Sequence, residues 1–569
     1  MIWFISHLRF SVQKTHLAIL LLLAAGLFSC KSDAEHKEQE IPPKWYRNSI
    51  IYNLDVDTYQ DSNGDGVGDF KGLTKRLPYL DSLGVDVVWL SPFQPSPDKD
   101  DGYDITDFYG IDPRLGTMKD FEAFMEAAKS NDIKIVMDMV LNHTSIEHPW
   151  FKQDRENNAV KSMPRYVWSD KKPKDFDKGM VFPGIQTETW TYDEISKKYY
   201  FHRFYDFQPD LNYQSQEVLN ESVKILKFWV GKGIKGFRLD AVPFIIDIPE
   251  SGTADPELMF NVLDTLVNAT KTIDKDILLL GEANVAPDEN IDFFGKNGER
   301  LSMMFNFYAN QYLFYSLAKE DPTLFLKAME DTRDKPVDAQ WAFFLRNHDE
   351  IDLARLSNRQ RKDVFESFGP ETNMQLYERG IRKRLASMLN NPDQLKMAYS
   401  LLYALPGTPV IRSGEEIGMG DDLTLQERLS VRTPMQWNGS KNAGFSTAEK
   451  TIRPVISQGS FSYKTINVSL QLANQTSLLN YIRNLIRLRK KCPEIGQTNW
   501  QLAKIDNDVV KLTYPSKKGD LVILHNFSST PKEIKIHLPS GTADLLTGSK
   551  TIQNGKIKLK GYGVAWLRD

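Results

Sequence analysis

The stretch Ile234–Asp240, which reads IKGFRLD, decides the fold because it is a short apolar run that ends in charged side chains. Arg238 and Asp240 are two residues apart, so on a β-strand their side chains point to the same face. Similar runs alternate along the chain with helix-length amphipathic stretches, a pattern typical of a parallel sheet wrapped by helices. The other runs are Ile50–Val56, Val85–Leu90, Ile133–Asp138, Ile277–Glu282, Ser302–Phe307, Trp341–Arg346 and Thr408–Arg412. Together these strands predict an α/β chain built on a closed (β/α)8 TIM barrel.

Polar residues follow several of these strands directly. They are Asp138 with Asn142 and His143, Arg238 with Asp240, Glu282 alone, and Asn347 with His348 and Asp349. In a β/α barrel the chemistry takes place where the strands end and the following loops begin. We therefore expect these side chains to meet at one mouth of the barrel.

The spacing of the polar clusters predicts the domain organisation. Asp138 and Asp240 are 102 residues apart, far more than one βα unit of about 30 residues. We therefore expect a barrel from residues 44–144 and 213–495, with an inserted subdomain at 145–212 after the third strand. The insertion is rich in aromatic residues, which either wall a substrate cleft or form its own core.

The chain changes its pattern near the carboxyl end. After a helix expected near Leu478–Leu488, apolar residues recur with a period of two, and Asn554-Gly555 lies between alternating runs as a hairpin turn would. Residues 496–569 are therefore predicted to form a separate antiparallel β-sandwich domain.

The first residues look like an export signal. Positive residues precede the apolar run Leu17–Leu27, which is too short to span a bilayer comfortably and has the length of a signal-peptide core. The run ends in LFSC at Cys30, which resembles the lipobox of bacterial lipoproteins. We expect a signal peptide at residues 1–29, lipidation of Cys30, and a solvated tether at 30–43. The alternative is an ordinary cleaved signal.

An acylated Cys30 implies a lipid-anchored protein of a bacterial membrane, facing the periplasm or the cell surface, with no other membrane contact. The chain has only 2 cysteines, so Cys492 would have no partner and the fold would form without disulfides. Its 71 Lys and Arg against 75 Asp and Glu leave a net charge of −4 without a basic stripe, which argues against nucleic acid as a partner.

Two of the strand-end acids have contrasting surroundings. Arg238 beside Asp240 favours the ionised carboxylate, so we predict a lowered pKa for Asp240, as a nucleophile needs near neutral pH. Glu282 follows the apolar segment LLLG, which predicts a raised pKa and suits a general acid. Such a pair is the apparatus that breaks a glycosidic bond. A third acid, Asp349, is able to hold substrate hydroxyls or to stabilise positive charge. Each acid alone would more often be a salt-bridge partner.

Four segments make the chain recognisable. Residues 138–143 (DMVLNH), 236–241 (GFRLDA), 281–284 (GEAN) and 344–349 (FLRNHD) resemble, in order, the sequence regions of glycoside hydrolase family 13, the α-amylase family. The resemblance implies Asp240 as nucleophile, Glu282 as acid/base and Asp349 as stabiliser of the transition state. It also implies a set of sugar-binding residues: Tyr103, Asp104, His143, Arg238, His348 and Arg432. A covalent intermediate on Asp240 predicts retention of configuration, with the two carboxyl groups about 5–5.5 Å apart.

The segment Asp61–Asp69, DSNGDGVGD, alternates oxygen-bearing side chains with glycines, as a loop around Ca²⁺ requires. The predicted ligands of this structural calcium ion are Asp61, Asn63, Asp65, Val67 and Asp69. The alternative is a loop of Asx turns without metal. By the same family resemblance, a second metal site is expected near Asn142 and Asp210. No organic cofactor is expected.

The reaction outcome rests on finer similarities. Residues 208–212 (QPDLN) and 432–437 (RTPMQW) look like the branch of oligo-1,6-glucosidases, α-glucosidases and trehalose synthases, and 378–386 (ERGIRKRLA) looks most like trehalose synthase. Val56-Asp57-Thr58-Tyr59, without an arginine, and Arg412-Ser413, without aromatic residues, depart from that pattern.

We expect a retaining α-glucoside hydrolase or transglucosidase that acts on maltose and short α-glucans. A trehalose synthase, which interconverts maltose and trehalose, is the alternative. A catalytically silent protein that binds glucan or supports a membrane partner is a distant third.

Overall fold

The computed structural model describes residues 44–156, 163–245, 256–497 and 499–569. Residues from Pro43 to the carboxyl end form one compact unit. The predicted signal peptide, Cys30 and the tether lie outside the described residues. No helix in the described part of the chain combines the length and the apolar character needed to cross a bilayer.

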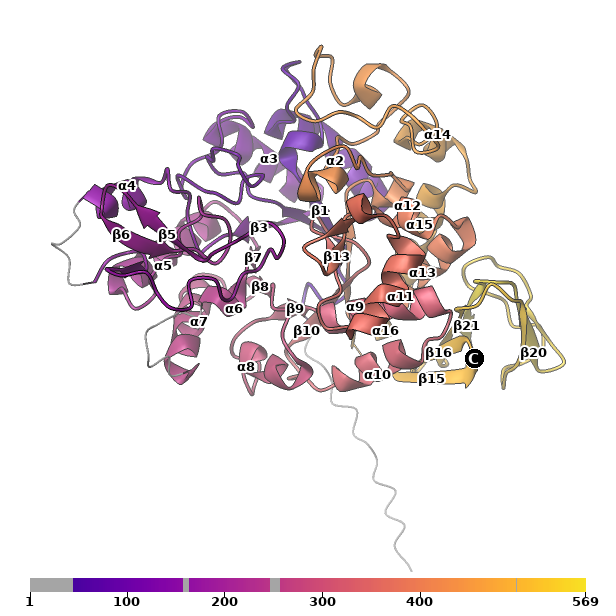
Figure 1. Cartoon of the computed structure of the whole chain (residues 1–569). Helices are drawn as coiled ribbons and strands as arrows, with labels where there is room; N and C mark the ends of the chain where they lie inside the picture. The colour runs from indigo at the N-terminus through magenta and orange to yellow at the C-terminus, as the bar shows by residue number, and fades with distance from the viewer. Residues whose placement is uncertain (1–43, 157–162, 246–255, 498) are drawn as a thin grey trace, which may run out of the picture. The chain divides into compact units, whose positions relative to one another are not determined.

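Within these ranges, eight parallel strands close into a barrel, and each overlaps one of the predicted runs (Figure 1). In barrel order they are β1 (Ile51–Leu54), β14 (Thr408–Arg412), β10 (Gln340–Phe344), β9 (Met303–Phe305), β8 (Leu278–Gly281), β7 (Gly236–Leu239), β3 (Lys134–Met139) and β2 (Val87–Leu90). The closed barrel confirms the predicted fold class. Because β7 pairs with β3 on one side and β8 on the other, the acids at the carboxyl ends of these strands are neighbours.

Both faces of the barrel strands are buried. Alternate residues such as Val87, Trp89 and Leu280 form one apolar cluster, while residues between them, such as Val88 and Leu279, join a larger cluster with the helices. This explains why the strands read as continuous apolar runs rather than as alternating ones.

Helices surround the barrel strands (Figure 1). The longer ones are α2 (Phe70–Leu83), α3 (Met118–Ser130), α5 (Gln216–Gly231), α7 (Pro256–Lys271), α9 (Phe307–Lys319), α10 (Thr323–Asp331), α11 (Asn358–Phe368), α13 (Pro392–Ala404) and α15 (Leu478–Lys491), which overlaps the helix expected at 478–488. Shorter ones are α4 (Pro149–Glu156), α6 (Val242–Ile245), α8 (Asn290–Phe294), α12 (Leu385–Leu389), α14 (Val468–Ala473) and α16 (Glu494–Gln497).

Helix α2 shows how local sequence fixes a boundary near the mouth. Its N-cap is Asp69, whose side chain accepts a hydrogen bond from the Gly72 amide, and it ends at Gly84 with φ 93°, a left-handed conformation that glycine adopts without strain. Asp69 therefore closes the loop Asp61–Asp69 and begins a barrel helix with the same side chain.

The inserted segment contains a small antiparallel sheet. Its strands are β4 (Trp168–Ser169), β6 (Lys198–Phe201) and β5 (Trp190–Asp193), with β6 in the middle. Phe151 of α4 stacks on Trp168 with ring centroids 5.4 Å apart and contacts Tyr200 edge-on. These aromatic residues pack on one another, and Phe151, Tyr166 and Tyr200 join the large apolar cluster that also contains the barrel helices, so they form no core separate from the barrel.

The carboxyl-terminal region forms two antiparallel sheets. One contains β15 (Gln501–Asp506), β16 (Val509–Tyr514), β17 (Leu521–Asn526) and β21 (Val564–Arg568), and the other β18 (Lys532–Lys535), β20 (Lys556–Leu559) and β19 (Ile552–Gln553). Apolar side chains of both sheets form one buried cluster. Asn554 and Gly555 connect β19 to β20 with φ of 51° and 69°, as a two-residue hairpin turn requires.

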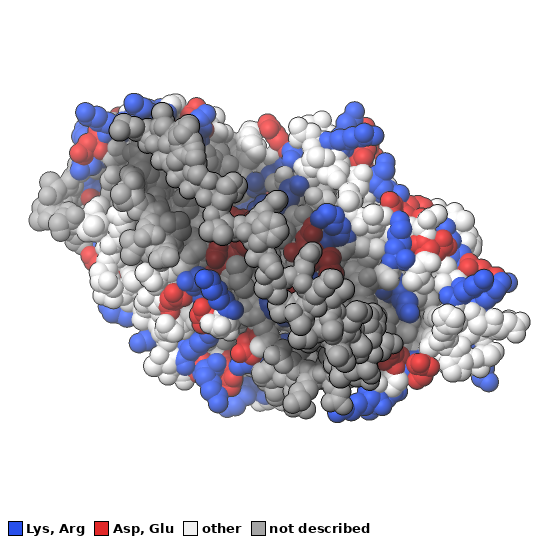
Figure 2. Space-filling model, turned by 90° about the horizontal axis from the view of Figure 1, so that it is seen from below, with Lys and Arg blue, Asp and Glu red and all other residues white. Residues whose placement is uncertain are grey.

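Charged residues of both signs are mixed on the surface. On the part of the face that Figure 2 leaves visible, Lys and Arg side chains are interspersed with Asp and Glu. No large area of this visible surface carries one sign of charge.

Candidate active site

A cavity of about 580 Å³ opens at the mouth where the barrel strands end. Six of the residues predicted from sequence line it: Tyr103, His143, Asp240, Glu282, Asn347 and Asp349. Aromatic side chains complete one wall: Phe182 and Phe204 come from the insertion and Phe244 from α6. The insertion therefore lines the cavity, as the other interpretation expected. The strand ends thus converge on one space, as predicted.

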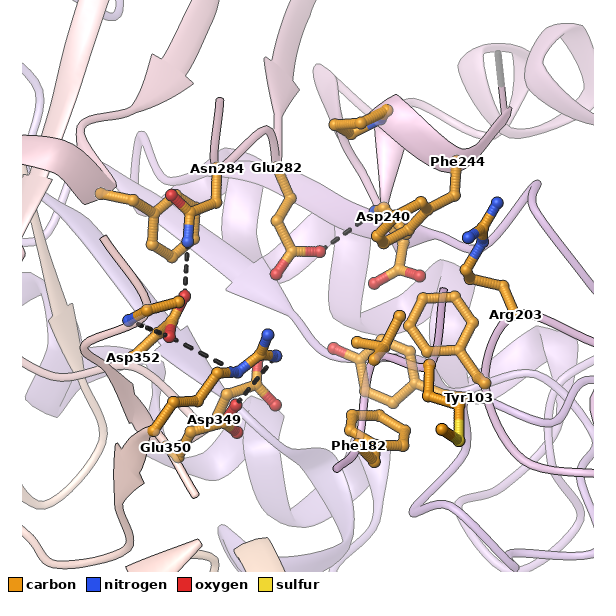
Figure 3. A pocket seen from close by; sticks show the side chains of 18 of the residues that line it. Tyr103, Phe182, Arg203, Asp240, Phe244, Glu282, Asn284, Asp349, Glu350 and Asp352 are labelled. Carbon is orange, nitrogen blue, oxygen red and sulfur yellow. Dashed lines mark hydrogen bonds and ion pairs between the residues drawn. The ribbon is translucent and has the colours of Figure 1, made fainter. Parts of the chain in front are cut away.

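One guanidinium joins the two central acids. Arg238 on β7 forms ion pairs with Asp240 directly after the same strand and with Glu282 after β8; its Nη2 is 2.7 Å from Glu282 Oε2. Figure 3 shows both carboxyl groups pointing into the same space, with Asp349 facing them from the other side. Both acids are therefore placed to act on one bound group.

The backbone also connects the two acids. Ala241, the residue after Asp240, has φ 51°, a left-handed conformation that is uncommon for residues other than glycine. Its amide donates a hydrogen bond of 3.0 Å to Glu282 Oε2. The strained conformation of Ala241 turns the chain so that the main chain after Asp240 holds the carboxyl group of Glu282.

Burial dominates the protonation of this pair. Burial raises the pKa of Glu282 to about 7, as the sequence predicted. It also raises the pKa of Asp240 to about 6, so the predicted lowering of that pKa was wrong. The reason is that Arg238, although it opposes the rise, is shared: its Nη1 also binds Asp138 Oδ1 at 2.8 Å. One positive charge does not offset the burial of three carboxyl groups.

Asp349 has the opposite surroundings. Its Oδ1 lies 2.9 Å from Arg428 and 3.0 Å from Arg432, and its Oδ2 lies 3.2 Å from His348 Nε2. Burial works to raise its pKa, but these neighbours and Arg238 hold the pKa well below the usual range. Asp349 is therefore a firmly ionised carboxylate.

Tyr103 connects the two sides of the cavity. Its hydroxyl donates to Asp138 Oδ2 at 2.9 Å and lies 2.6 Å from His348 Nε2, and its ring stacks on the His348 ring at an interplanar angle of 9°. His143 Nε2 lies 3.2 Å from the Tyr103 carbonyl, and burial lowers the pKa of His143 to about 3. Tyr103 and a neutral His143 thus form a fixed polar floor.

The remaining predicted residues lie behind the cavity lining. Arg238 and His348 are buried and contact the acids in front of them. Arg432 is buried and reaches Asp349 from behind. Asp104 is fully buried, does not line the cavity, and accepts a hydrogen bond of 2.8 Å from the Ser96 hydroxyl.

An ion pair that lines the cavity beside Asp349 was not predicted from the sequence. Asp100 and Arg428 each stand four positions before a predicted residue, Asp104 and Arg432, and both line the cavity. They form an ion pair of 2.7 Å, and Arg428 also binds Asp349. The signal in the sequence was a charged side chain four positions before a predicted residue.

The wall opposite the phenylalanines is polar and was also not predicted. Asn284, which follows β8, accepts from Arg355 Nε at 3.1 Å and contacts Asp352 on the short strand β11 (Ile351–Asp352). Arg379 lies 3.5 Å from Asp352 and 3.9 Å from Glu350, whose pKa burial raises to about 7. These charged and amide groups can hydrogen-bond to hydroxyl groups of a bound molecule.

The loop predicted to bind calcium is closed on itself. Asp61 Oδ1 accepts from the amides of Asn63 and Gly64 at 2.9 and 2.7 Å, and Asp65 Oδ1 accepts from Val67 at 2.8 Å. These are Asx turns, as in the alternative interpretation. In the described ranges, no three His, Cys, Asp or Glu side chains are grouped as around a metal ion.

The residues of the second predicted metal site are brought together. The Asn142 amide donates to Asp210 Oδ2 at 3.1 Å, and Asp210 Oδ1 accepts from the Arg203 amide at 2.8 Å. This contact connects the barrel loop after β3 to the end of the insertion. Both metal sites stay predictions.

Known proteins resemble the chain over most of its length. Trehalose synthase of Thermus thermophilus is 37% identical over 490 residues, which are 85% of this chain but only 50% of that protein. Trehalose synthase/amylase TreS of Mycobacterium tuberculosis is 36% identical over 88% of this chain and 85% of its own length. Glucan 1,6-alpha-glucosidase of Streptococcus pneumoniae is 31% identical over 87% and 93%.

Solved structures share the fold. Trehalulose synthase MutB superposes with a TM-score of 0.74 at 24% identity, covering 93% of this chain and all of that one. The family model described as alpha amylase, catalytic domain, matches residues 55–369 and 372–498. Together with the closed barrel and the acids at its mouth, this match establishes that the chain belongs to the α-amylase family, glycoside hydrolase family 13.

Proposed function

We propose that this protein is a retaining α-glucoside hydrolase and transglucosidase that acts on maltose and short α-glucans. The observation that carries the proposal is that Asp240 and Glu282 line one cavity and bind the same guanidinium behind it. The Asp240 carboxylate attacks the anomeric carbon while Glu282 protonates the leaving oxygen, which gives a covalent glucosyl-aspartate. Glu282 then removes a proton from the acceptor, whose attack releases Asp240 and restores the α configuration.

The protonation states support these roles. With pKa values of about 6 for Asp240 and about 7 for Glu282, the first acid is largely ionised and the second about half protonated near neutral pH. Asp349, held ionised by Arg428 and Arg432, faces the same space and would stabilise the positive charge that develops on the sugar ring. Tyr103, His143 and the Asp100–Arg428 pair would contact the glucose ring beside the nucleophile.

A second candidate is the interconversion of maltose and trehalose. The relatives named trehalose synthase are 35–37% identical to this chain, against 29–31% for those named glucan 1,6- or oligo-1,6-glucosidase. Both reactions share the glucosyl-aspartate and differ in the acceptor. A released glucose held against the polar wall of Asn284 and Asp352 would compete with water, because a well-oriented nucleophile has an effective molarity of about 10⁵ M or more.

The experiment is incubation of the purified protein with maltose, with glucose and trehalose quantified over time. Glucose alone supports the hydrolase, and accumulation of trehalose supports the isomerase. The matched control is D240N, which keeps the shape of the side chain but removes the nucleophile. Wild-type protein that forms neither product would overturn both candidates and favour a silent glucan-binding or membrane-partner protein. That third candidate is disfavoured because all three acids are present.

The anchor and the calcium ion belong to the same proposal. Lipidation of Cys30 would hold the enzyme at the outer side of a bacterial membrane, where external oligosaccharides are accessible; the C30S variant should leave the membrane fraction.

A Ca²⁺ ion at the Asp61–Asp69 loop would only stabilise the fold, so a chelator should lower the Tm and calcium should restore it. An unchanged Tm would favour the Asx-turn loop.

A further inference from the structure

A buried chain of alternating charges runs behind Asp349. It joins side chains from the loops after β1, β2, β10 and β14, and each member contacts the next. The order is Asp57, Arg453, Asp101, Arg432, Asp349, Arg428 and Asp100. Asp349 and the Asp100–Arg428 pair line the cavity; Arg432 lies behind Asp349, and Asp101 and Arg453 lie beyond it.

Arg453 and Asp101 fix the position of Arg432. Asp101 Oδ2 is 2.7 Å from Arg432 Nη1, and Arg453 contacts Asp101 Oδ1 through Nη2. Arg453 Nη1 also donates to the Arg432 carbonyl at 2.7 Å, so it holds the main chain as well as the side chain. Only 2% of the Arg432 side chain and 7% each of Arg453 and Asp101 are exposed. Water is therefore not available to replace a lost partner.

Arg432 in turn sets the orientation of Asp349. Its Nη2 is 3.0 Å from Asp349 Oδ1, and its Nε donates to the His348 carbonyl at 2.9 Å. The guanidinium is rigid and planar, so the contact of Nη1 with Asp101 determines where Nη2 points. The far side of the chain ends at Asp57, 2.8 Å from Arg453.

We propose that Arg453 and Asp101 are positioning residues for glucosyl transfer: through Arg432 they aim the Asp349 carboxylate at the bound sugar ring. This inference rests on the proposed function. A carboxylate stabilises a developing charge only if it is already in place, since its reorientation would add to the barrier. Neither residue carries a motif of the family resemblance, and neither contacts the cavity.

The test measures kcat and KM for maltose with R453Q and D101N. We expect kcat to fall about 10- to 100-fold in both, with KM changed much less, because a small displacement of a reacting group costs rate. R453Q removes a positive charge and D101N a negative one, so a common loss reports geometry rather than the electric field. Since both act through Arg432, the double variant should lose no more than the worse single variant.

The control for destabilisation is R489Q. Arg489 is also buried, but it binds the carbonyls of Tyr403 and Leu405, remote from the charge chain. We expect R489Q to lower the Tm while kcat per folded molecule stays unchanged. If R453Q fails to fold, R453K keeps the buried charge; a single ammonium cannot bind Asp57, Asp101 and the Arg432 carbonyl as the guanidinium does.

Wild-type kcat in folded D101N or R453K would overturn the inference, as would losses that only follow the folded fraction. Wild-type protein that turns over maltose while D240N does not would leave the proposed function intact in that case. An inactive wild-type protein would instead refute the proposed function itself.

Discussion

The two sides of the cavity use the same kinds of residue in opposite proportions. On one side a single Arg238 serves Asp138, Asp240 and Glu282, and burial raises the pKa of all three acids. On the other side Arg428 and Arg432 both bind Asp349, and its pKa is held low. Two guanidinium groups thus contact the single carboxylate of Asp349, whereas one guanidinium is divided among three buried acids, and this difference accounts for the opposite pKa shifts.

The largest loss of activity is expected from D240N, which removes the nucleophile on the side where the pKa values are raised. We expect kcat to fall about 10⁴-fold or more, as when the nucleophile of a catalytic group is lost, with the Tm little changed because Arg238 keeps two carboxyl partners. Steady-state kinetics and a thermal melt measure this. A variant with wild-type kcat would refute Asp240 as nucleophile.

A smaller loss of activity is expected from R428Q, on the side of the cavity that contains Asp349. Asp349 would keep Arg432 but lose one of its two guanidinium partners, and Asp100 would lose its ion pair. We expect kcat/KM to fall about 100-fold. The matched control is R355Q on the polar wall, where no contact to Asp349 is lost; an equal loss there would contradict a special role of the charged side.

The pH dependence of the rate tests the difference in pKa between the two sides of the cavity without a mutation. Activity needs Asp240 ionised and Glu282 protonated, with pKa values of about 6 and about 7. The rate should therefore rise as pH passes about 6 and fall above about 7, a narrow bell, while Asp349 titrates far below this range. A broad plateau from pH 5 to 9 would be incompatible with a shared Arg238.

The smallest expected effect is on stability. The pKa of Glu282 is raised from about 4.5 to about 7 by burial, so its contribution to stability is present below about pH 4.5 and is lost as pH rises through about 7. E282Q has no charge to bury, and at pH 8 its free energy of unfolding should exceed that of the wild type by on the order of 1–3 kcal/mol. The difference should shrink at pH 5; denaturant unfolding at both pH values tests the sign.

Much of the barrel could be predicted because each strand is buried on both faces and reads as one apolar run. The positions of Asp240 and Glu282 could be predicted for the same reason, since each acid directly follows an apolar run and therefore lies at the carboxyl end of a barrel strand. The raised pKa of Asp240 could not be predicted from the sequence. It depends on the sharing of Arg238, and that sharing depends on pairing between β3, β7 and β8, which are far apart in the chain. Asp100 lies in a turn and Arg428 in the short 3-10 helix Glu427–Val431, both outside the barrel strands, so their distance from a motif in the sequence does not determine where their side chains point.

The left-handed Ala241 has a consequence for how such a site can change. Because its amide donates a hydrogen bond to Glu282, the proposed nucleophile and the proposed acid/base are held beside each other by main chain at two neighbouring strand ends. Asn284, Asp352 and Arg355, which would face the departing group, belong to a separate network. Substitutions there can alter which molecule receives the glucose, water or a sugar, while the bond-breaking unit stays as it is.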